Sequence, residues 1–266
     1  MMHHHKTILE KVHEIHPLVH HITNNVTIND CANITLCIRA SPVMAHAHEE
    51  VADMVNIANA LVLNIGTLDP YQVESMRIAA EAAEKRDIPI ILDPVGAGAT
   101  PYRTQVAQEL ISAYPIAVIK GNVGEIATLA GIDATVRGVD AGAFSGDPRF
   151  AARDLAEKED TIVAITGETD VIANAQQTIF VKNGVKEMGS ISGTGCMAAS
   201  LIGSCTAVTS DYLAAATTAL CAFGIAGEHA VMGVHGPFSY KVKLFDALSN
   251  LTSDVLIKEG RIEKLE

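Results

Sequence analysis

Short apolar runs rich in β-branched residues alternate with longer helical segments along most of this chain, and this alternation constrains the fold more than any other feature. The runs cover residues 61–65, 89–93, 116–119 and 161–165. Each is apolar almost throughout rather than at alternate positions, which is typical of strands covered on both faces of a parallel sheet. We therefore expect an α/β fold in which helices flank both faces of a central, mostly parallel sheet.

Helical segments are predicted between these runs, and the pattern changes near the end of the chain. The predicted helices cover residues 71–86, 104–114, 122–130 and 149–158, and three more begin near Gly195, Asp211 and Ser239. Residues 170–173 and 178–182, with Asn183-Gly184 as a turn, predict antiparallel hairpins at one edge of the sheet.

Nothing in the sequence divides the chain into separate units. It contains no internal repeat, linker or low-complexity run, so we expect a single domain over residues 1–266. A glycine-rich loop is expected over residues 138–147. Residues 1–6 include three consecutive histidines, and we treat this segment as a tag remnant or a disordered start.

Composition excludes several classes of function. The formal net charge of -12, the absence of Trp and an aromatic content of 4% argue against nucleic-acid binding, which needs basic and aromatic surfaces. No run is long and apolar enough to span a membrane, since threonines and a glycine interrupt the stretch over residues 214–227. The five cysteines form no C-x-x-C motif, which favours a reducing cytoplasm over a disulfide framework.

Polar residues follow the predicted strands at the points where these strands end. Asn64, Asp93, Lys120 and Thr166 all occupy such positions, and Asn122 comes shortly after Lys120. Because open parallel sheets bind ligands at the carboxyl edge of their strands, this placement predicts a small-molecule site there.

The stretch Gly193-Thr194-Gly195-Cys196 is a glycine-rich turn that opens directly into a predicted helix. Glycines allow an anion to approach the backbone closely, and the amides at the start of a helix stabilise negative charge. A tight loop that needs glycine only for its backbone shape remains an equally good interpretation of these residues alone.

Three other candidates are also open to two interpretations. Asp93 precedes a second glycine-rich loop and could hold magnesium through water or cap the turn. Asn122 and Glu125 lie one helical turn apart, which suits a hydrated magnesium ion but equally a capping box. The pair Asn24-Asn25 follows the run over residues 18–23 and could bind a ligand or form an Asx turn.

Familiar motifs of other enzyme classes are absent or weak. The chain has no G-x-x-x-x-G-K-[ST] and no G-x-S-x-G. The loop after Asp93 carries Pro101 at the third glycine position of a dinucleotide fingerprint, so that assignment is weak. The pairs His20-His21 and His46-x-His48 are improbable metal ligands, because adjacent strand residues face opposite ways and loop histidines are usually solvated.

Taken together, these segments resemble the hydroxyethylthiazole kinase family of the ribokinase-like superfamily. The matching stretches run in order from about residue 17 to about residue 251: HITNNV (21–26), ASPVMA (40–45), EEVADM (49–54), ALVLNIGTL (60–68), ILDPVGAGAT (91–100), GN (121–122), ITGE (165–168) and GTGC (193–196). Each stretch is weak alone, whereas eight in order are specific.

The resemblance implies a ribokinase-like fold and ATP-dependent phosphorylation of the primary hydroxyl of 4-methyl-5-(2-hydroxyethyl)thiazole, giving the thiazole phosphate of thiamine biosynthesis or salvage. It also implies Mg²⁺ as cofactor and a homotrimer with thiazole sites at subunit interfaces. The implied roles are substrate binding by Asn25, Met44 and Gly193, ATP binding by Lys120, Asn122 and Thr166, metal binding by Asp93 and Glu125, and an anion hole with the catalytic group over Gly193, Thr194, Gly195 and Cys196.

Three positions refine this expectation. Lys120 stands where the family often has arginine, which replaces a bidentate phosphate contact by a point charge, and Ser192 stands where threonine is common. Cys196 lies where the wider superfamily carries an aspartate base. A helix N-terminus favours the thiolate form, so Cys196 is expected to accept the hydroxyl proton of the substrate or, alternatively, only to pack the start of the helix.

Other functions remain open on the sequence. A related kinase would use another small alcohol, such as a pyrimidine or a pyridoxal-like compound. The dehydratase that repairs hydrated nicotinamide cofactors shares the fold, but an acid would be expected at the position of Cys196. A ligand sensor without turnover is the third alternative, and the intact Asp93, Asn122 and Glu125 speak against it.

Overall fold

The computed structural model describes residues 2–132 and 146–265, and its strands form one nine-stranded sheet in the order β2-β1-β3-β4-β5-β6-β7-β8-β9. The first five pairings in this order are parallel, and the last three are antiparallel. The strands are β1 (Leu18–Ile22), β2 (Ser41–Val43), β3 (Ala60–Asn64), β4 (Ile90–Asp93), β5 (Ile116–Gly121), β6 (Ile162–Ile165), β7 (Asp170–Ala173), β8 (Thr178–Val181) and β9 (Ile262–Leu265).

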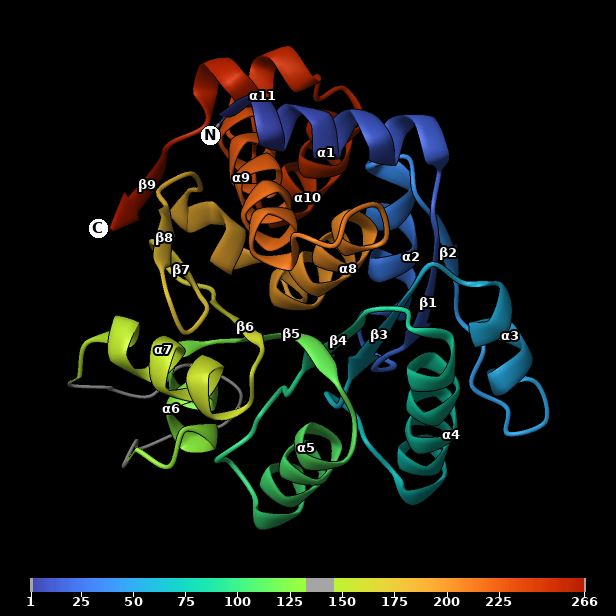
Figure 1. Cartoon of the computed structure of the whole chain (residues 1–266). Helices are drawn as coiled ribbons and strands as arrows, with labels where there is room; N and C mark the ends of the chain where they lie inside the picture. The colour runs from blue at the N-terminus through green and yellow to red at the C-terminus, as the bar shows by residue number, and fades with distance from the viewer. Residues whose placement is uncertain (1, 133–145, 266) are drawn as a thin grey trace.

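Helices cover both faces of this sheet, which confirms the expected fold class (Figure 1). One face is covered by α1 (Met2–Ile15), α2 (Ile28–Cys37), α8 (Thr194–Thr206), α9 (Tyr212–Ala230), α10 (Pro237–Ser249) and α11 (Ser253–Glu259). The other face is covered by α3 (Val51–Ile57), α4 (Pro70–Arg86), α5 (Pro101–Ala113), α6 (Val123–Leu129) and α7 (Pro148–Lys158). The strands between these layers are apolar throughout because both of their faces are buried.

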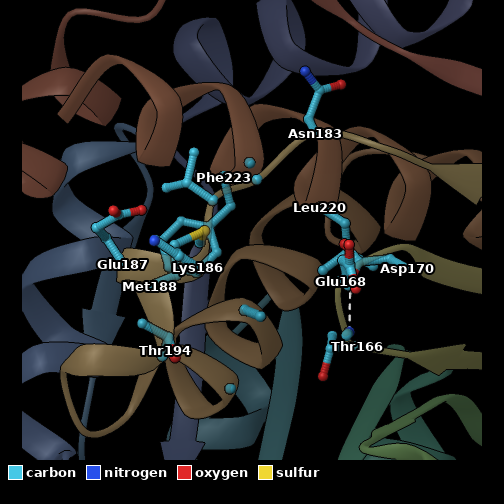
Figure 2. Close-up of a pocket in the computed structure, with 17 residues that line it drawn as sticks. Thr166, Glu168, Asp170, Asn183, Lys186, Glu187, Met188, Thr194, Leu220 and Phe223 are labelled. Atoms are coloured by element: carbon cyan, nitrogen blue, oxygen red, sulfur yellow. Dashed lines mark hydrogen bonds between the residues drawn. The ribbon is translucent and has the colours of Figure 1, made fainter. Parts of the chain in front are cut away.

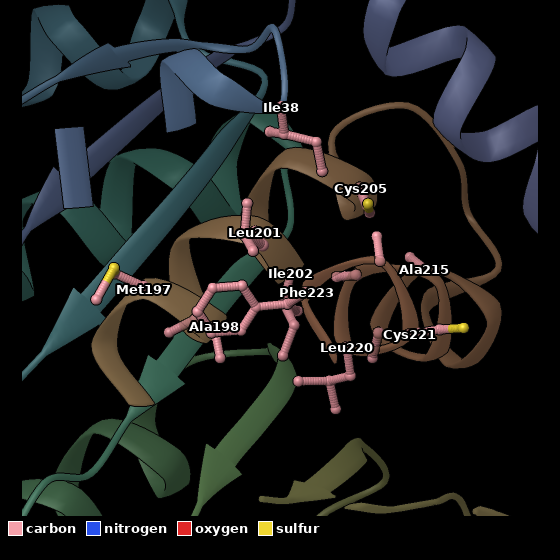
Figure 3. Close-up of a cluster of buried hydrophobic side chains, with 14 of the residues drawn as sticks. Ile38, Met197, Ala198, Leu201, Ile202, Cys205, Ala215, Leu220, Cys221 and Phe223 are labelled. Atoms are coloured by element: carbon pink, nitrogen blue, oxygen red, sulfur yellow. The ribbon is translucent and has the colours of Figure 1, made fainter. Parts of the chain in front are cut away.

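Helices α8 and α9 form the centre of the first layer. Leu201 and Ile202 of α8 are buried together with Leu220 and Phe223 of α9, as Figure 3 shows. Gly203 brings α8 close to the sheet, since a Cβ at this position would lie 2.6 Å from Cγ2 of Val62. This packing holds the N-terminus of α8 at the edge of the sheet where the parallel strands end.

Most predicted elements are confirmed, and the differences have local causes. Helix α5 begins at Pro101, earlier than expected, because the side chain of Thr100 caps it and proline suits the first helical position. The turn between β7 and β8 is built by Asn174, whereas Asn183-Gly184 leads from β8 into the 3₁₀ helix η1 (Lys186–Ser190). Of the glycine-rich loop expected over residues 138–147, residues 138–145 lie outside the part that is described.

The expectation for the start of the chain needs correction. Residues 2–6 are the first part of helix α1 rather than a disordered start. His5 is only 2% exposed, and its Nδ1 lies 2.8 Å from the hydroxyl of Thr218 in α9. The segment is ordered because it lies across the long apolar helix α9.

None of the helices in the described ranges is both long and apolar enough to cross a bilayer. Helix α9, which contains the apolar stretch noted in the sequence, is instead buried along most of its length between the sheet and its neighbouring helices.

Candidate active site

The carboxyl ends of the parallel strands bring three of the predicted polar residues together. Asn64 ends β3, Asp93 ends β4 and Lys120 lies near the end of β5. The Nδ2 atom of Asn64 donates to Oδ2 of Asp93 at 2.7 Å, and the Nζ atom of Lys120 donates to Oδ1 at 3.3 Å. Both oxygens of Asp93 are therefore acceptors, in a side chain that is fully buried.

Lys120 is a buried cation among anionic groups. Burial acts to lower its pKa, but the neighbouring carboxylates Asp93 and Glu125 raise that pKa above its usual value. Burial raises the pKa of Asp93, while Lys120 and Asn64 act against this rise. The ammonium of Lys120 is thus held at the strand edge by its pairing with Asp93.

Glu125 and Asn122 form the capping box that the sequence left as one of two interpretations. The side chain of Asn122 accepts from the backbone N–H of Glu125 at 2.9 Å, and Oε2 of Glu125 accepts from the N–H of Asn122 at 2.7 Å. The other oxygen of Glu125 accepts from the N–H of Gly96 at 2.8 Å. Burial raises the pKa of Glu125 to about 7, and Lys120 opposes this rise.

The N-terminus of α8 faces the same region as Lys120. Gly193 precedes the helix with φ +93°, and a Cβ there would lie 2.5 Å from Cγ2 of Thr27, so only glycine fits this position. A Cβ on Gly195 would lie 3.0 Å from Nζ of Lys120. The lysine ammonium and the first amides of α8 therefore face the same small volume, which suits the binding of an anion.

Cys196 lies in the first turn of α8, but its thiol is not activated as expected. Burial, followed by the negative charge of Asp93, raises the pKa of Cys196, and Lys120 offsets this only in part. The helix N-terminus was expected to favour the thiolate, whereas burial and the charge of Asp93 favour the protonated thiol. The sulfur accepts a hydrogen bond from Nδ2 of Asn24 at 3.3 Å.

A cavity of about 740 Å³ lies beside the N-terminus of α8. It is bounded by Thr194 and Gly195 of α8, Thr166 after β6, residues 183–189 and the side chain of Phe223. Figure 2 shows Thr194 and Thr166 along its lower edge, with Lys186 and Met188 above Thr194. Its volume lies within the range typical of pockets that take cofactor-sized ligands.

A second, smaller cavity contains the two predicted substrate residues that lie early in the chain. Asn25 and Met44 line a space of about 110 Å³ together with His21, Gln72 and six other residues. The loop that carries Asn25 also carries Thr27, which packs against Gly193 at the start of α8. The loop over residues 23–27 therefore joins the small cavity to the helix terminus that lines the large one.

The predicted site residues fall into one connected region, and two amides that the sequence placed at strand ends link its parts. Asn24 and Asn64 connect Asp93 to Cys196 by hydrogen bonds. The sequence did not reveal these links, because no local spacing encodes the contact between the two amides.

Three histidines of the two pairs contact backbone carbonyls or an aromatic ring. His20 and His21 are buried, and each ring bonds a backbone carbonyl, of Ala45 and Val19 respectively. His48 stacks on the ring of Tyr71. Within residues 2–132 and 146–265, no group of three or more His, Cys, Asp or Glu side chains could hold a metal ion.

The donor set nevertheless suits one kind of magnesium site. Mg²⁺ is usually held by one or two carboxylates, several waters and the phosphates of a substrate rather than by a cage of protein ligands. Asp93 and Glu125 supply two such carboxylates, and although their oxygens already accept hydrogen bonds, each retains a further lone pair. These residues therefore fit a hydrated ion shared with phosphates.

The chain is similar to known kinases along almost its whole length. The hydroxyethylthiazole kinase of Methanocorpusculum labreanum is 55% identical over 259 residues, which cover 97% of this chain and 98% of that protein. A solved structure of a hydroxyethylthiazole kinase from Pyrococcus horikoshii superimposes with a TM-score of 0.91 at 40% identity, covering 99% of this chain and all of that one.

A more distant likeness concerns the fold alone. The pyridoxal kinase of Staphylococcus aureus superimposes with a TM-score of 0.64 at 13% identity, covering 94% of this chain and 98% of that one, which confirms the ribokinase-like fold. The Hydroxyethylthiazole kinase family matches residues 9–254. With most of its length matched in this way, the chain belongs to the hydroxyethylthiazole kinase family.

Proposed function

We propose that this chain transfers the γ-phosphoryl group of ATP to the primary hydroxyl of 4-methyl-5-(2-hydroxyethyl)thiazole, giving the thiazole phosphate of thiamine biosynthesis or salvage. One observation carries the proposal. The N-terminus of α8, with the ammonium of Lys120 facing Gly195, lines the large cavity and packs against the loop that lines the small one. A phosphoryl group at this terminus could be approached from both cavities.

We assign ATP to the large cavity and the thiazole to the region of Asn25 and Met44. Thr166 lines the large cavity, and its hydroxyl lies at the end of β6 beside Gly121. Lys120 would meet the phosphates beside α8, and Asn122 lies at the N-terminus of α6, next to Glu125. Gly193 would lie against the substrate because it touches the loop that carries Asn25.

Catalysis in this arrangement rests on positioning and on stabilisation of charge. Phosphoryl transfer has a loose transition state, so fixed positive groups around the phosphoryl oxygens matter more than removal of a proton. The amides of Thr194, Gly195 and Cys196 and the ammonium of Lys120 supply such groups. When bound through Asp93 and Glu125, Mg²⁺ would neutralise part of the phosphate charge.

Cys196 enters this mechanism mainly as a neutral thiol. Its raised pKa keeps the sulfur protonated near neutral pH, so only a small fraction of molecules holds a thiolate that can accept the hydroxyl proton. The sulfur still lies in the first turn of α8, where it would help to orient the alcohol. A modest contribution to the rate is the expected consequence.

We further propose a cytoplasmic, single-domain protomer that assembles as a homotrimer with thiazole sites at subunit interfaces. Val26, adjacent to Asn25, is 68% exposed, and Phe238 and Val242 on the neighbouring helix α10 are 82% and 62% exposed. Such apolar side chains beside a candidate substrate loop favour a partner subunit over solvent. Light scattering coupled to size-exclusion chromatography would give the mass of the assembly.

The activity is tested by incubating the chain with ATP, Mg²⁺ and hydroxyethylthiazole and by following the phosphate ester by mass spectrometry. Pyridoxal and a hydroxymethylpyrimidine serve as competing alcohols in parallel reactions. We expect the thiazole to have the highest kcat/KM of the three. Faster phosphorylation of either competitor would refute the substrate assignment, and no ester with any alcohol would refute kinase activity.

A further inference from the structure

Two buried asparagines connect Asp93 to Cys196 by a continuous chain of hydrogen bonds. Nδ2 of Asn64 donates to Asp93 at 2.7 Å, and Oδ1 of Asn64 accepts from Nδ2 of Asn24 at 2.9 Å. The same Nδ2 of Asn24 donates its second hydrogen to the sulfur of Cys196 at 3.3 Å. Asn24 and Asn64 are 3% and 1% exposed, so water does not compete for these bonds.

Backbone groups fix the direction of both amides. Oδ1 of Asn24 accepts from the N–H groups of Val26 and Thr27 at 3.1 and 3.0 Å, so its oxygen cannot exchange places with its nitrogen. Oδ1 of Asn64 accepts from the N–H of Gly66 at 2.9 Å, which fixes the second amide in the same way. Nδ2 of Asn64 therefore faces the carboxylate of Asp93, and Nδ2 of Asn24 faces Oδ1 of Asn64 and the sulfur of Cys196.

The two amides also hold three separate segments at a fixed spacing. Asn24 belongs to the loop after β1, Asn64 to the end of β3, and Cys196 to the first turn of α8. A Cβ on Gly66 would lie 2.9 Å from the Cβ of Asn24, so the first two segments are in close contact. A change at either amide would alter the distance between the substrate loop and the phosphate end of the site.

We propose that Asn24 and Asn64 are positioning residues, which hold the carboxylate of Asp93 and the sulfur of Cys196 in the geometry that phosphoryl transfer requires. The proposal rests on the proposed function, because it assigns the two amides to the same reaction. Neither asparagine needs to touch ATP or the alcohol. Each acts through the group to which it donates.

This role predicts a loss in kcat rather than in nucleotide affinity. Removing one donor to a charged or catalytic group corresponds to about a 10- to 100-fold fall in kcat. The KM for ATP should change by less than about three-fold, because the large cavity contains neither asparagine. The KM of the alcohol should rise in Asn24→Ala, since Asn24 also caps the loop that carries Asn25.

Two substitutions of Asn24 separate its donor from its cap. Asn24→Ala removes both, whereas Asn24→Asp keeps the oxygen that accepts from Val26 and Thr27 and removes only the donor. Because the introduced carboxyl group would face the acceptor Oδ1 of Asn64, we expect both variants to lose kcat and stability, and only Asn24→Ala to raise the KM of the alcohol by removing the loop cap. Recovery of kcat in Asn24→Asp would show that Asn24 only caps the loop, and would overturn the proposal for this residue.

A double-mutant cycle with Cys196→Ala tests whether Asn24 acts through the sulfur. We expect Asn24→Ala to lower kcat at least ten-fold in the wild-type background and less than three-fold in the Cys196→Ala background. Equal effects in both backgrounds would overturn the link, as would a Cys196→Ala variant with unchanged kcat. The cycle uses whichever alcohol the wild-type chain phosphorylates fastest, so that an incorrect thiazole assignment does not affect it.

Asn59 provides a matched control for Asn64. Its Oδ1 accepts from the N–H of Leu18 at 2.8 Å, and it lies just before β3 while Asn64 ends that strand. Asn59→Ala should lower stability without changing kcat or either KM, whereas Asn64→Leu should lower kcat with little change in the KM for ATP. Similar kinetic constants for the two variants would overturn a positioning role for Asn64.

Discussion

Two glycines of helix α8 are expected to respond in opposite ways to the same substitution. Gly195 lies in the first turn, where an added Cβ would be 3.0 Å from the ammonium of Lys120. Gly203 lies two turns further on, where the Cβ would be 2.6 Å from a methyl group of Val62 and 3.2 Å from one of Val19. The first methyl group enters the site, and the second enters the core.

Gly195→Ala is expected to reduce turnover rather than stability. Alanine in a helix is more stable than glycine by up to about 1 kcal/mol, so Gly195→Ala should leave stability unchanged or slightly raised. The lysine must retreat by a few tenths of an ångström from a position where it already lies 3.3 Å from Asp93. Displacements of this kind reduce turnover on the order of ten-fold, since about 1 Å can cost a hundred-fold.

Gly203→Ala should behave in the reverse way. Its methyl group meets side chains on the buried face of the sheet, and overpacking of this kind costs about 1–3 kcal/mol. Turnover per folded molecule should not change, because none of these side chains lines either cavity.

For each variant, urea unfolding gives the unfolding midpoint and steady-state kinetics gives kcat. We expect Gly195→Ala to have the wild-type unfolding midpoint and a lower kcat. We expect Gly203→Ala to have a lower unfolding midpoint and the wild-type kcat at temperatures where it is folded. Full activity in Gly195→Ala would refute the placement of the phosphoryl group between Lys120 and the start of α8.

Three further predictions concern the titratable and charged groups of the structure. Cys196→Ala should lower kcat about ten-fold without weakening ATP binding, which is less than the roughly 10²–10⁴-fold of a general base because the raised pKa of the thiol keeps it protonated; a loss above a thousand-fold would contradict this. Lys120→Met should lower the free energy of unfolding by about 3–5 kcal/mol by leaving Asp93 buried without its cation; adding Asp93→Asn should recover part of this loss in urea titrations, and no recovery would count against the ion pair. Burial lowers the pKa of His5 to about 4, so between pH 7.5 and 5.5 the unfolded chain binds a proton that the folded chain does not, and stability falls by about 1 kcal/mol. His5→Asn keeps a donor for Thr218 and should lose that share of the pH dependence; a variant with the full wild-type dependence would contradict the assignment.

The sequence predicted the sheet well because its signal is local. Strands β3 and β4 are apolar along their whole length, and the residues that end them, Asn64 and Asp93, are polar. Burial on both faces imposes this pattern whatever the rest of the chain does. Strand β9 was overlooked, since only its pairing with β8 makes residues 262–265 a strand.

The site was predictable as a set of positions but not as a set of contacts. Asp93, Lys120 and Gly195 could be placed at one edge of the sheet from their positions after strands and before a helix. The links through Asn24 and Asn64 join residues 29, 40 and 172 positions apart, and no local pattern encodes such distances.

Cys196 shows why the chemistry of a residue cannot be assigned from its helical position alone. The first turn of a helix favours a thiolate, and the sequence contains that information. The opposing effects are desolvation and the carboxylate of Asp93, which belongs to a strand far away in the chain. Together these two effects raise the pKa of the thiol, and only the assembled fold brings them to Cys196.

The charges around the large cavity bear on whether ATP would enter it alone or together with a metal ion. Glu168, Asp170 and Glu187 line it with Lys186 as the only cationic side chain among its described residues, and the whole chain carries a formal charge of -12. Burial raises the pKa of Asp170 to about 7, which removes part of this negative charge but not all of it. A free triphosphate would therefore meet repulsion that the amides of α8 and one buried lysine only partly offset. The balance favours ATP entering together with a divalent cation, so that in this acidic protein the proposed anion site would draw its positive charge from backbone amides, Lys120 and that cation.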